Sequence, residues 1–554
     1  MASLAQRNGQ LGRRLSAHLL RRVTFGPKRA EIDDLASRTA DEAVDLLMNF
    51  PPIPPPPVDP ATGLTWVVTG RGGANSDDDD LKAIVNSWWL HQVFDPNIPV
   101  NAVQKVFFFL HCSFVTGLDV IEYSENHYYT LRLLYHYVDK SYKDLALKMC
   151  LDNGMNDFLD IGESEKNSPN ENFVREFFEL FTIGKGPQIG DGDYTTFTEQ
   201  DVAEAARLMT GFRRNDAWDD PLGYDPDTGL PRATFDIGRH DTSDKIFSNA
   251  FQNTIITGRA LETDMILEVQ EFVNMIFAQD ATALEITRRM YRFFVRPLIT
   301  QEVEDDIIVP LATNLKNNNY QIIPVLKQLL KSEHFYDEGN PDTTDEIVGG
   351  LIKSPLELQA GVIRFFDLPI PDPALDAFAS YITFYRFGIQ RPQSEACFDL
   401  FMPPEVAGYP PIYQNPDFNR LWMNSKSLPA RHQIIEEHIY GNDPLRLDLM
   451  SWVNNPANIT DYTGNDPMGN AGPHAGARIA HHLVQELVDY LLPEARDANR
   501  FSYFMDEILL DNLSETSWMF EWDTYVASGD DTAVRLQIEK LVRGILQSPE
   551  YSLA

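Results

Sequence analysis

Two carboxylates and a guanidinium recur at helical spacing in the stretch PNENFVREFFELF, residues 169–181. Its phenylalanines repeat every three to four residues and predict a buried helix face. Arg175, Glu176 and Glu179, together with Asn172, fall on the opposite face as one polar patch. Paired carboxylates can act as acid and base in hydrolysis, and a guanidinium binds anions. We therefore predict Glu176 and Glu179 as catalytic residues and Arg175 as an anion-binding residue.

A loop histidine and a core histidine are further candidates. His240 and Asp241 stand in the aperiodic sequence TFDIGRHDTSDK, where the pair is either catalytic or a local surface turn. His111 stands in the nearly all-apolar VFFFLHCSFV, where a lone histidine is either a hydrogen-bonded core residue or a ligand. A mixed set of nitrogen and oxygen ligands suits zinc, manganese or iron. We predict His111, Glu176 and His240 as ligands of a divalent metal cofactor, although no spacing along the chain joins them.

Five sequence blocks resemble one known family. Besides the PNEN stretch they are HLLRRVTFG (18–26), KVFFFLHCSFVTG (105–117), KSPLEL (353–358) and FMPPEVAGYPP (401–411). They span nearly the whole chain, which resembles the bacterial family known only as domain of unknown function 1800. The resemblance implies an all-helical architecture and a second histidine two residues after His111, where this chain has Ser113. It also implies a protein partner, since family members are often encoded beside a phosphatase- or sulfatase-like protein.

A basic triad lies in the first predicted helix. His18, Arg21 and Arg22 are three and four residues apart and share one helix face. One interpretation is an anion clamp, in which Arg21 and Arg22 bind a sulfate, phosphate or carboxylate group of a substrate. The other is structural: if the family's fold places this helix against Glu176 and Glu179, the arginines neutralise those carboxylates in a buried network.

Composition limits the classes of partner. The chain has 554 residues, and its 43% hydrophobic content supports a large core. It carries 46 basic and 82 acidic side chains, a formal net charge of -36, which repels phosphate backbones and anionic lipid surfaces. Nucleic acid is therefore not an expected partner. No apolar run is long enough to span a bilayer, so we expect no membrane insertion.

The cellular compartment is predicted only indirectly. Three cysteines without ligand-like spacing indicate neither a disulfide scaffold nor a zinc knuckle. The N-terminal segment contains arginines but no continuous apolar stretch or cleavage site, so we expect no signal peptide. Cytoplasmic location is the default expectation. The alternative is an envelope or extracellular location, reached by export together with a partner.

Helical periodicity dominates the chain, and strand-like alternation is scarce. The predicted class is all-α, with one large multi-helix domain and long irregular loop insertions. The predicted parts are N-terminal helices in residues 1–50, a Pro-, Gly- and Asp-rich surface excursion in 51–80, a central helical core in 81–212, an irregular loop region in 213–258, and C-terminal helices in 259–554 with insertions at about 371–425 and 454–473.

Two functions fit these observations. The leading hypothesis is an envelope-related, metal-dependent hydrolase with a polar site on the PNEN helix, because clusters of titratable groups are typical of tuned sites. The alternative is a non-catalytic partner or assembly protein of the phosphatase- or sulfatase-like class, in which the charged cluster only stabilises the fold. Motifs for nucleotide binding, HExxH metalloproteases and Gly-x-Ser-x-Gly hydrolases are absent from the sequence.

Overall fold

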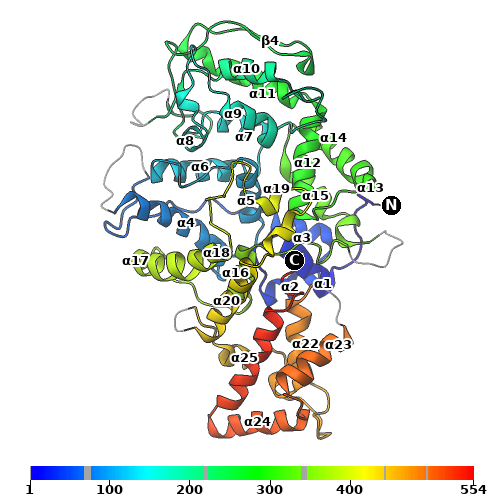
Figure 1. Ribbon diagram of the computed structural model, residues 1–554. Helices are drawn as coiled ribbons and strands as arrows, with labels where there is room; N and C mark the ends of the chain where they lie inside the picture. Colours follow the sequence, from blue (N-terminus) through cyan, green and yellow to red (C-terminus); the bar gives the residue numbers. More distant parts are fainter. Residues whose placement is uncertain (1, 68–75, 216–222, 339–345, 442–444, 494–496) are drawn as a thin grey trace.

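Helices form almost the whole molecule in the computed structural model, which describes all residues except 1, 68–75, 216–222, 339–345, 442–444 and 494–496 (Figure 1). The described residues contain only two small sheets, each of two antiparallel strands. The prediction of one all-α domain is therefore confirmed. In Figure 1 the helices form an upper part around α7 to α11, a middle part around α1 to α6, α12 and α16, and a lower part of α22 to α25.

The middle part begins with the N-terminal helices α1 (Gly12–Val23), α2 (Arg29–Ala36), α3 (Ala40–Leu47), α4 (Asp78–Phe94), α5 (Val103–Ser113) and α6 (Ser124–Tyr137). The upper part comprises α7 (Tyr142–Met149), α8 (Asn153–Phe158), α9 (Asn172–Glu176), the π-helical segment η2 (Phe177–Phe181), α10 (Glu199–Leu208) and α11 (Met265–Phe277). Next come α12 (Asp280–Phe294), α13 (Gln301–Val303), π-helical η6 (Glu304–Ile308), α14 (Val309–Asn317) and α15 (Ile322–Leu330).

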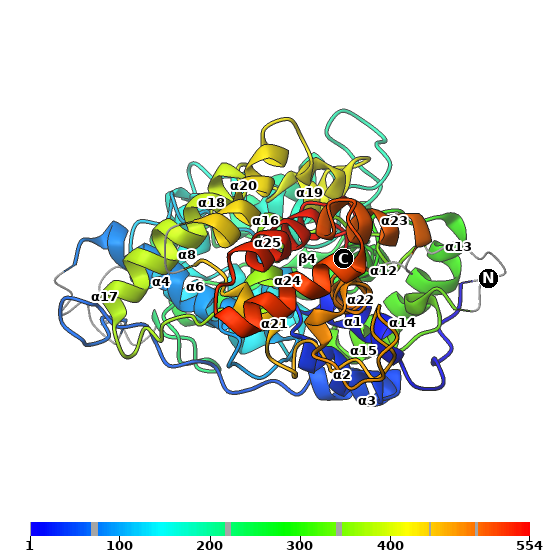
Figure 2. The ribbon, with the colours of Figure 1, turned by 90° about the horizontal axis from the view of Figure 1, so that it is seen from below.

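The C-terminal half returns to the middle part before it forms the lower one. Its first helices are α16 (Pro355–Phe365), α17 (Ala377–Ala379), π-helical η8 (Ser380–Gln390), α18 (Arg391–Glu395), α19 (Pro410–Tyr413) and α20 (Ser427–Tyr440). The last are α21 (Leu449–Val453), α22 (Ala480–Leu491), α23 (Ala498–Ser502), π-helical η11 (Tyr503–Leu509), α24 (Glu515–Ser528) and α25 (Thr532–Leu546). Seen from below, α24 and α25 lie in front of the other helices (Figure 2).

Two helices of the middle part follow directly from their sequences. The apolar helix predicted around His111 is α5, and its phenylalanines are buried among neighbouring aromatic rings. α16 begins after Ser354, whose hydroxyl caps the helix at the Glu357 amide while the Glu357 carboxylate returns to the Ser354 amide. Pro355 occupies the first turn, as its missing amide proton allows.

The helices α1 and α16 are held close by two glycines. A β-carbon added at Gly26, just after α1, would lie 2.4 Å from the α-carbon of Gly361 in α16. No real β-carbon contact is that short, so this approach requires glycine at position 26. Their proximity places the basic face of α1 beside the first turns of α16.

The irregular regions contain short elements of their own. In or beside the predicted loop region there are two antiparallel strand pairs: β1 (Phe212–Arg213) with β2 (Thr234–Phe235), and β3 (Lys245–Ile246) with β4 (Ile255–Ile256). The predicted excursion 51–80 has exposed prolines, but Trp66 is buried and its indole donates to Ser124 Oγ at 3.0 Å. Part of this segment is therefore anchored to α6. None of the helices in the described parts has the length and apolarity needed to cross a bilayer.

Candidate functional site

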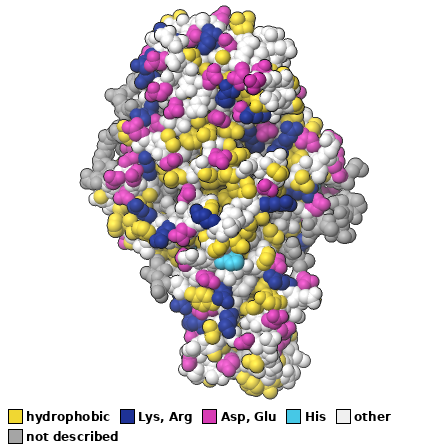
Figure 3. Space-filling model, in the orientation of Figure 1, with side chains coloured by type: hydrophobic (Ala, Val, Ile, Leu, Met, Phe, Trp, Pro, Cys, Tyr) yellow, Lys and Arg dark blue, Asp and Glu magenta, His cyan; other side chains and the backbone are white. Residues whose placement is uncertain are grey.

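Charge is distributed differently inside and outside the molecule. Figure 3 shows acidic and basic side chains interspersed over one face. Among the described buried residues, eleven are Lys or Arg and nine are Asp or Glu, although the whole chain has 46 basic and 82 acidic side chains. The interior is thus enriched in cations relative to the sequence. Burying a charge is costly unless it is compensated. Seven of these eleven cations form salt bridges with carboxylates, whereas in the described part of the chain Arg21, Arg22, Lys353 and Arg431 form none.

The α1 arginines belong to this interior. Arg21 Nη2 donates to the Tyr490 carbonyl at 2.7 Å, and Arg22 Nη2 donates to the Ile347 carbonyl. Burial lowers the pKa of Arg21 to about 10 and that of Arg22 to about 9. Glu357 is the carboxylate that acts most strongly on Arg22. The predicted network with Glu176 and Glu179 is therefore wrong, because helix packing brings α16 against α1 instead.

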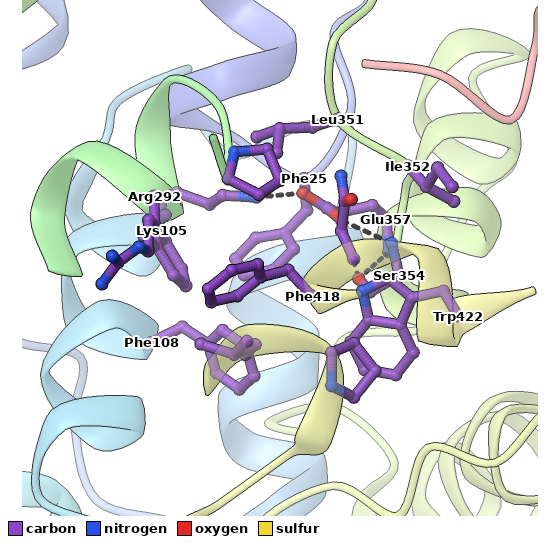
Figure 4. Close-up of a pocket in the computed structure, with 15 residues that line it drawn as sticks. Phe25, Lys105, Phe108, Arg292, Leu351, Ile352, Ser354, Glu357, Phe418 and Trp422 are labelled. Carbon is purple, nitrogen blue, oxygen red and sulfur yellow. Dashed lines mark hydrogen bonds and ion pairs between the residues drawn. The ribbon is translucent and has the colours of Figure 1, made fainter. Parts of the chain in front are cut away.

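Glu357 is the carboxylate at the centre of a buried cluster, which we call the Glu357 cluster and which also contains Arg22, Lys105 and Ser354 (Figure 4). Its carboxylate forms a salt bridge with Lys105 of α5, and Ser354 Oγ donates to it at 2.8 Å. Burial raises the pKa of Glu357, but Lys105 and these hydrogen bonds outweigh burial, so the pKa lies below its usual value. Glu357 is thus held as a carboxylate by a cation from another helix.

Three neighbouring cavities surround this cluster. The first, of about 60 Å³, contains Lys105, Ser354 and Glu357 and is shown in Figure 4. The second, of about 20 Å³, shares Phe25 and Glu357 with the first. The third, of about 180 Å³, shares its wall with the first through Arg292, Phe293, Ile412 and Phe418. A row of small cavities therefore leads from α1 to the PNEN helix.

The third cavity, which we call the Glu179 cavity, brings charged groups of two helices together. Glu179 of η2 lines it together with Glu285, Arg289 and Arg292 of α12. Arg289 is engaged, since its Nε donates to Glu285 at 3.1 Å. Arg292 has a buried Nε without a hydrogen-bond partner, and burial lowers the pKa of its guanidinium. Arg292 is therefore a cation available to an anion in this cavity.

Aromatic residues of one chain segment cover the first and third cavities. This cover segment, residues 407–422, contains α19 and the 3-10 helix η9 (Phe418–Trp422). Ile412 and Phe418 line both cavities, and the guanidinium carbon of Arg292 lies 5.2 Å from the centre of the Phe418 ring. Arg292 was not predicted as a site residue, because nothing in its local sequence pattern distinguishes it from other arginines of predicted helices. Glu357 lies in the block KSPLEL, which carries part of the family resemblance, but it was not predicted as a site residue.

The predicted polar patch of the PNEN helix is divided in the structure. Arg175 of α9 turns outward and pairs with Glu199 at 2.7 Å and with Glu171 at 2.9 Å. Glu179 pairs with Lys185 at 2.6 Å and faces its cavity. Burial, followed by the neighbouring charge of Glu179, raises the pKa of Glu176. The two predicted catalytic carboxylates are thus neighbours in different environments, and of the two only Glu179 lines this cavity.

The predicted catalytic pair His240 and Asp241 lies in a different cluster. His240 Nδ1 bonds to the Thr210 carbonyl at 2.8 Å, and Nε2 bonds to Glu268 at 3.1 Å, with both side chains fully buried. Both ring nitrogens are thereby engaged. Burial alone would raise the pKa of Asp241, but hydrogen bonds from Arg207 and Ser243 hold it below its usual value. In the described part of the chain, His240 and Asp241 therefore contact Thr210, Glu268 and Arg207 and do not contact Glu176 or Glu179.

His111 is fully buried in α5 and packs against Phe401, with ring centres 4.8 Å apart. Burial lowers the pKa of His111 to about 3 and likewise that of its neighbour His127. No three His, Cys, Asp or Glu side chains in the described part of the chain are grouped to hold a metal ion. The structure therefore does not assemble the predicted set of His111, Glu176 and His240, whose donors lie in separate clusters.

The fold and these cavities define an all-helical protein with cation-rich internal sites. A family model matches residues 18–553 of its sequence. The chain belongs to this family, DUF1800, which is described as a protein of unknown function. Neither the curated proteins nor the solved structures contain a match.

Proposed function

We propose that this protein is a hydrolase whose substrate carries an anionic group and binds in the Glu179 cavity. The observation that carries the proposal is that two chemical groups line the same cavity. They are the carboxylate of Glu179 and the guanidinium of Arg292, whose Nε has no hydrogen-bond partner. In this proposal Arg292 binds the anionic group, and Glu179 accepts a proton from the attacking water. Glu176, with its raised pKa, is the neighbouring proton donor.

Three further features support this assignment. A volume of about 180 Å³ accommodates a small substrate group, and Glu285 and Arg289 complete the polar wall. The cover segment supplies apolar walls that limit water access, which strengthens electrostatic interactions in a site. Of the three predicted metal ligands, only Glu176 takes part in these roles, and it does so as a proton donor. The hypothesis still includes a divalent cofactor and an envelope location. The described residues contain no dedicated set of ligands for that cofactor.

The test is a comparison of three variants on a panel of phosphate, sulfate and carboxylate-bearing ester substrates. We expect Glu179→Gln to lower kcat about 100-fold or more while its melting temperature stays at the wild-type value. Arg292→Met should raise KM for the anionic substrate. The matched control is Glu199→Gln, which removes a carboxylate that pairs with Arg175 outside the cavity and should keep full activity. Wild-type inactivity over the whole panel, or full activity of Glu179→Gln, would refute the proposal.

A second candidate function is the partner role, and one surface favours it. Leu375, Phe378 and Phe387, in and beside α17 and η8, are 87%, 64% and 53% exposed. Exposed apolar groups of this size are typical of protein contacts. Under this alternative the chain assembles with a phosphatase- or sulfatase-like protein through this surface. Co-purification of the two, lost in Phe378→Asp and kept in an exposed-site control such as Leu513→Asp, would support it.

A further inference from the structure

The second cavity is built differently from the Glu179 cavity. It has a volume of about 20 Å³ and lies where α1, α16, α22 and the last residues of the chain meet. Its polar lining comes from Arg21, Lys353, Glu357, Tyr490 and Tyr551. A space of this size holds only a small molecule or ion. The Glu179 cavity shares none of these five residues.

Hydrogen-bond donors in this cavity lack acceptors. Arg21 is 6% exposed and Tyr551 is 2% exposed, so neither is solvated from outside. The Nη1 atom of Arg21 and the hydroxyl of Tyr551 have no hydrogen-bond partner. Leaving a buried donor unsatisfied costs free energy, and the cost is larger for a charged group. Two unsatisfied donors on one small cavity indicate that an acceptor belongs between them.

The charges around the cavity lead to the same conclusion. Lys353 Nζ donates to the Tyr551 carbonyl at 2.7 Å, and Arg431 Nη1 donates to the Lys353 carbonyl at 2.9 Å. Arg21 Nη2 likewise donates a hydrogen bond to a carbonyl, that of Tyr490. These three cations therefore interact with neutral backbone groups. Arg431 also has two further nitrogens, Nε and Nη2, that are buried without a partner.

The nearby carboxylate of Glu357 offsets the positive charge of Lys353 and Arg431 only in part. Glu357 already forms the salt bridge with Lys105 and accepts hydrogen bonds from Ser354. Burial and the neighbouring Arg21 lower the pKa of Lys353 well below its usual value. Burial is the largest cause of this shift, the positive charges of Arg21 and Arg431 add to it, and the carboxylate of Glu357 opposes it. One additional negative charge in the cavity would relieve both the repulsion and the unsatisfied donors.

We propose that the second cavity is a binding site for a small inorganic anion, held by Arg21 Nη1, Lys353 Nζ and the hydroxyl of Tyr551. Phosphate, sulfate and chloride share the required chemistry, since each accepts hydrogen bonds from cations and hydroxyls. The bound anion joins α1, α16 and the C-terminal residues through one set of contacts. Its position beside Glu357 also separates it from the Glu179 cavity, so this site stands independently of the proposed hydrolase.

The experiment measures melting temperature in sodium gluconate, whose anion is too large for the cavity. Sodium chloride, sulfate or phosphate then replaces gluconate at constant ionic strength. We expect at least one small anion to raise the melting temperature by a few degrees in a saturable manner, because a ligand that binds only the folded state stabilises it. Equal melting temperatures in all four salts would overturn the proposal. The saturation curves also show which anion binds most tightly.

Two variants and one control locate the effect. Tyr551→Phe removes a hydroxyl that has no partner in the structure, so it should fold normally and raise the half-saturating anion concentration tenfold or more. Arg21→Met removes an uncompensated charge, so in gluconate it should melt at or above the wild-type temperature and lose the anion response. Tyr320→Phe, whose hydroxyl donates to the Phe277 carbonyl elsewhere, should keep the wild-type response. An unchanged response in Tyr551→Phe would show that the anion binds at another place.

Discussion

The buried cluster around Glu357 predicts a strong asymmetry between its acidic and basic members. Glu357→Gln removes the carboxylate that acts on Lys105, Arg22 and Arg431. Glutamine at this position can still form the capping box with Ser354, so the helix start is preserved. Lys105→Met removes one cation, but Glu357 keeps Ser354 and the nearby arginines. The loss of the acid should therefore cost much more than the loss of the base.

The expected magnitudes follow from the burial of the two partners. Stranding a buried charge by removing its partner costs about 3 to 5 kcal/mol. Glu357→Gln leaves Lys105 as a buried charge without its partner, since the Lys105 side chain is only 5% exposed. It also removes the carboxylate that acts on Arg22 and Arg431. Lys105→Met loses one ion pair but leaves other cations around the carboxylate, so we expect about 1 to 2 kcal/mol. The difference should be on the order of 2 kcal/mol or more.

Urea unfolding followed by the fluorescence of the eight tryptophans measures these free energies. Both variants should be compared with the wild type in gluconate, so that no small anion substitutes for the missing carboxylate. The asymmetry requires Glu357→Gln to unfold at the lower urea concentration. An equal or larger loss in Lys105→Met would refute the reasoning, because it would mean that Glu357 depends on Lys105 alone and that the arginines are compensated elsewhere.

Two further predictions concern groups outside the cluster. Burial raises the pKa of Asp152 from 3.8 to about 6, so its contribution to stability is fully present below about pH 4 and is lost as the pH rises through 6. Urea titrations should show a decline on the order of 3 kcal/mol from this group, absent in Asp152→Asn. Gly26→Ala should cost about 1 to 3 kcal/mol by thermal unfolding, because its β-carbon would lie 2.4 Å from Gly361. Gly361→Ala is the control: its β-carbon meets only the Tyr551 hydroxyl at 3.1 Å, so a larger loss there would contradict the packing argument.

The PNEN helix shows how far local patterns can be trusted. Its apolar face was predicted correctly, since Phe173 and Phe177 are buried. The single polar patch was not, because the helix changes from α9 to the π-helical segment η2 at Phe177. A π-helical turn contains more residues than an α-helical turn and changes the direction of the side chains that follow. Arg175 therefore faces Glu199, while Glu179 faces the cavity.

Ionisable residues in loops were harder to place than those in helices. His240 and Asp241 were selected because a histidine beside a carboxylate is chemically suggestive, yet each is engaged by its own partners. Those partners, Glu268 and Arg207, lie in α11 and α10. No periodicity connects a loop to a helix 30 residues away along the chain, so only folding shows that the pair is satisfied.

The all-helical class, the family, the buried helix α5 and the capped start of α16 all follow from the amino-acid sequence. Each of these depends on residues that are close together in the chain, whose spacing and capping chemistry act locally. The tertiary structure alone decided that Arg21 and Arg22 lie near Glu357 and that Arg292 shares a cavity with Glu179. These contacts depend on how helices that are more than a hundred residues apart in the sequence pack together. Both proposed sites lie where such helices pack together, because only packing brings buried cations without partners to the wall of one cavity.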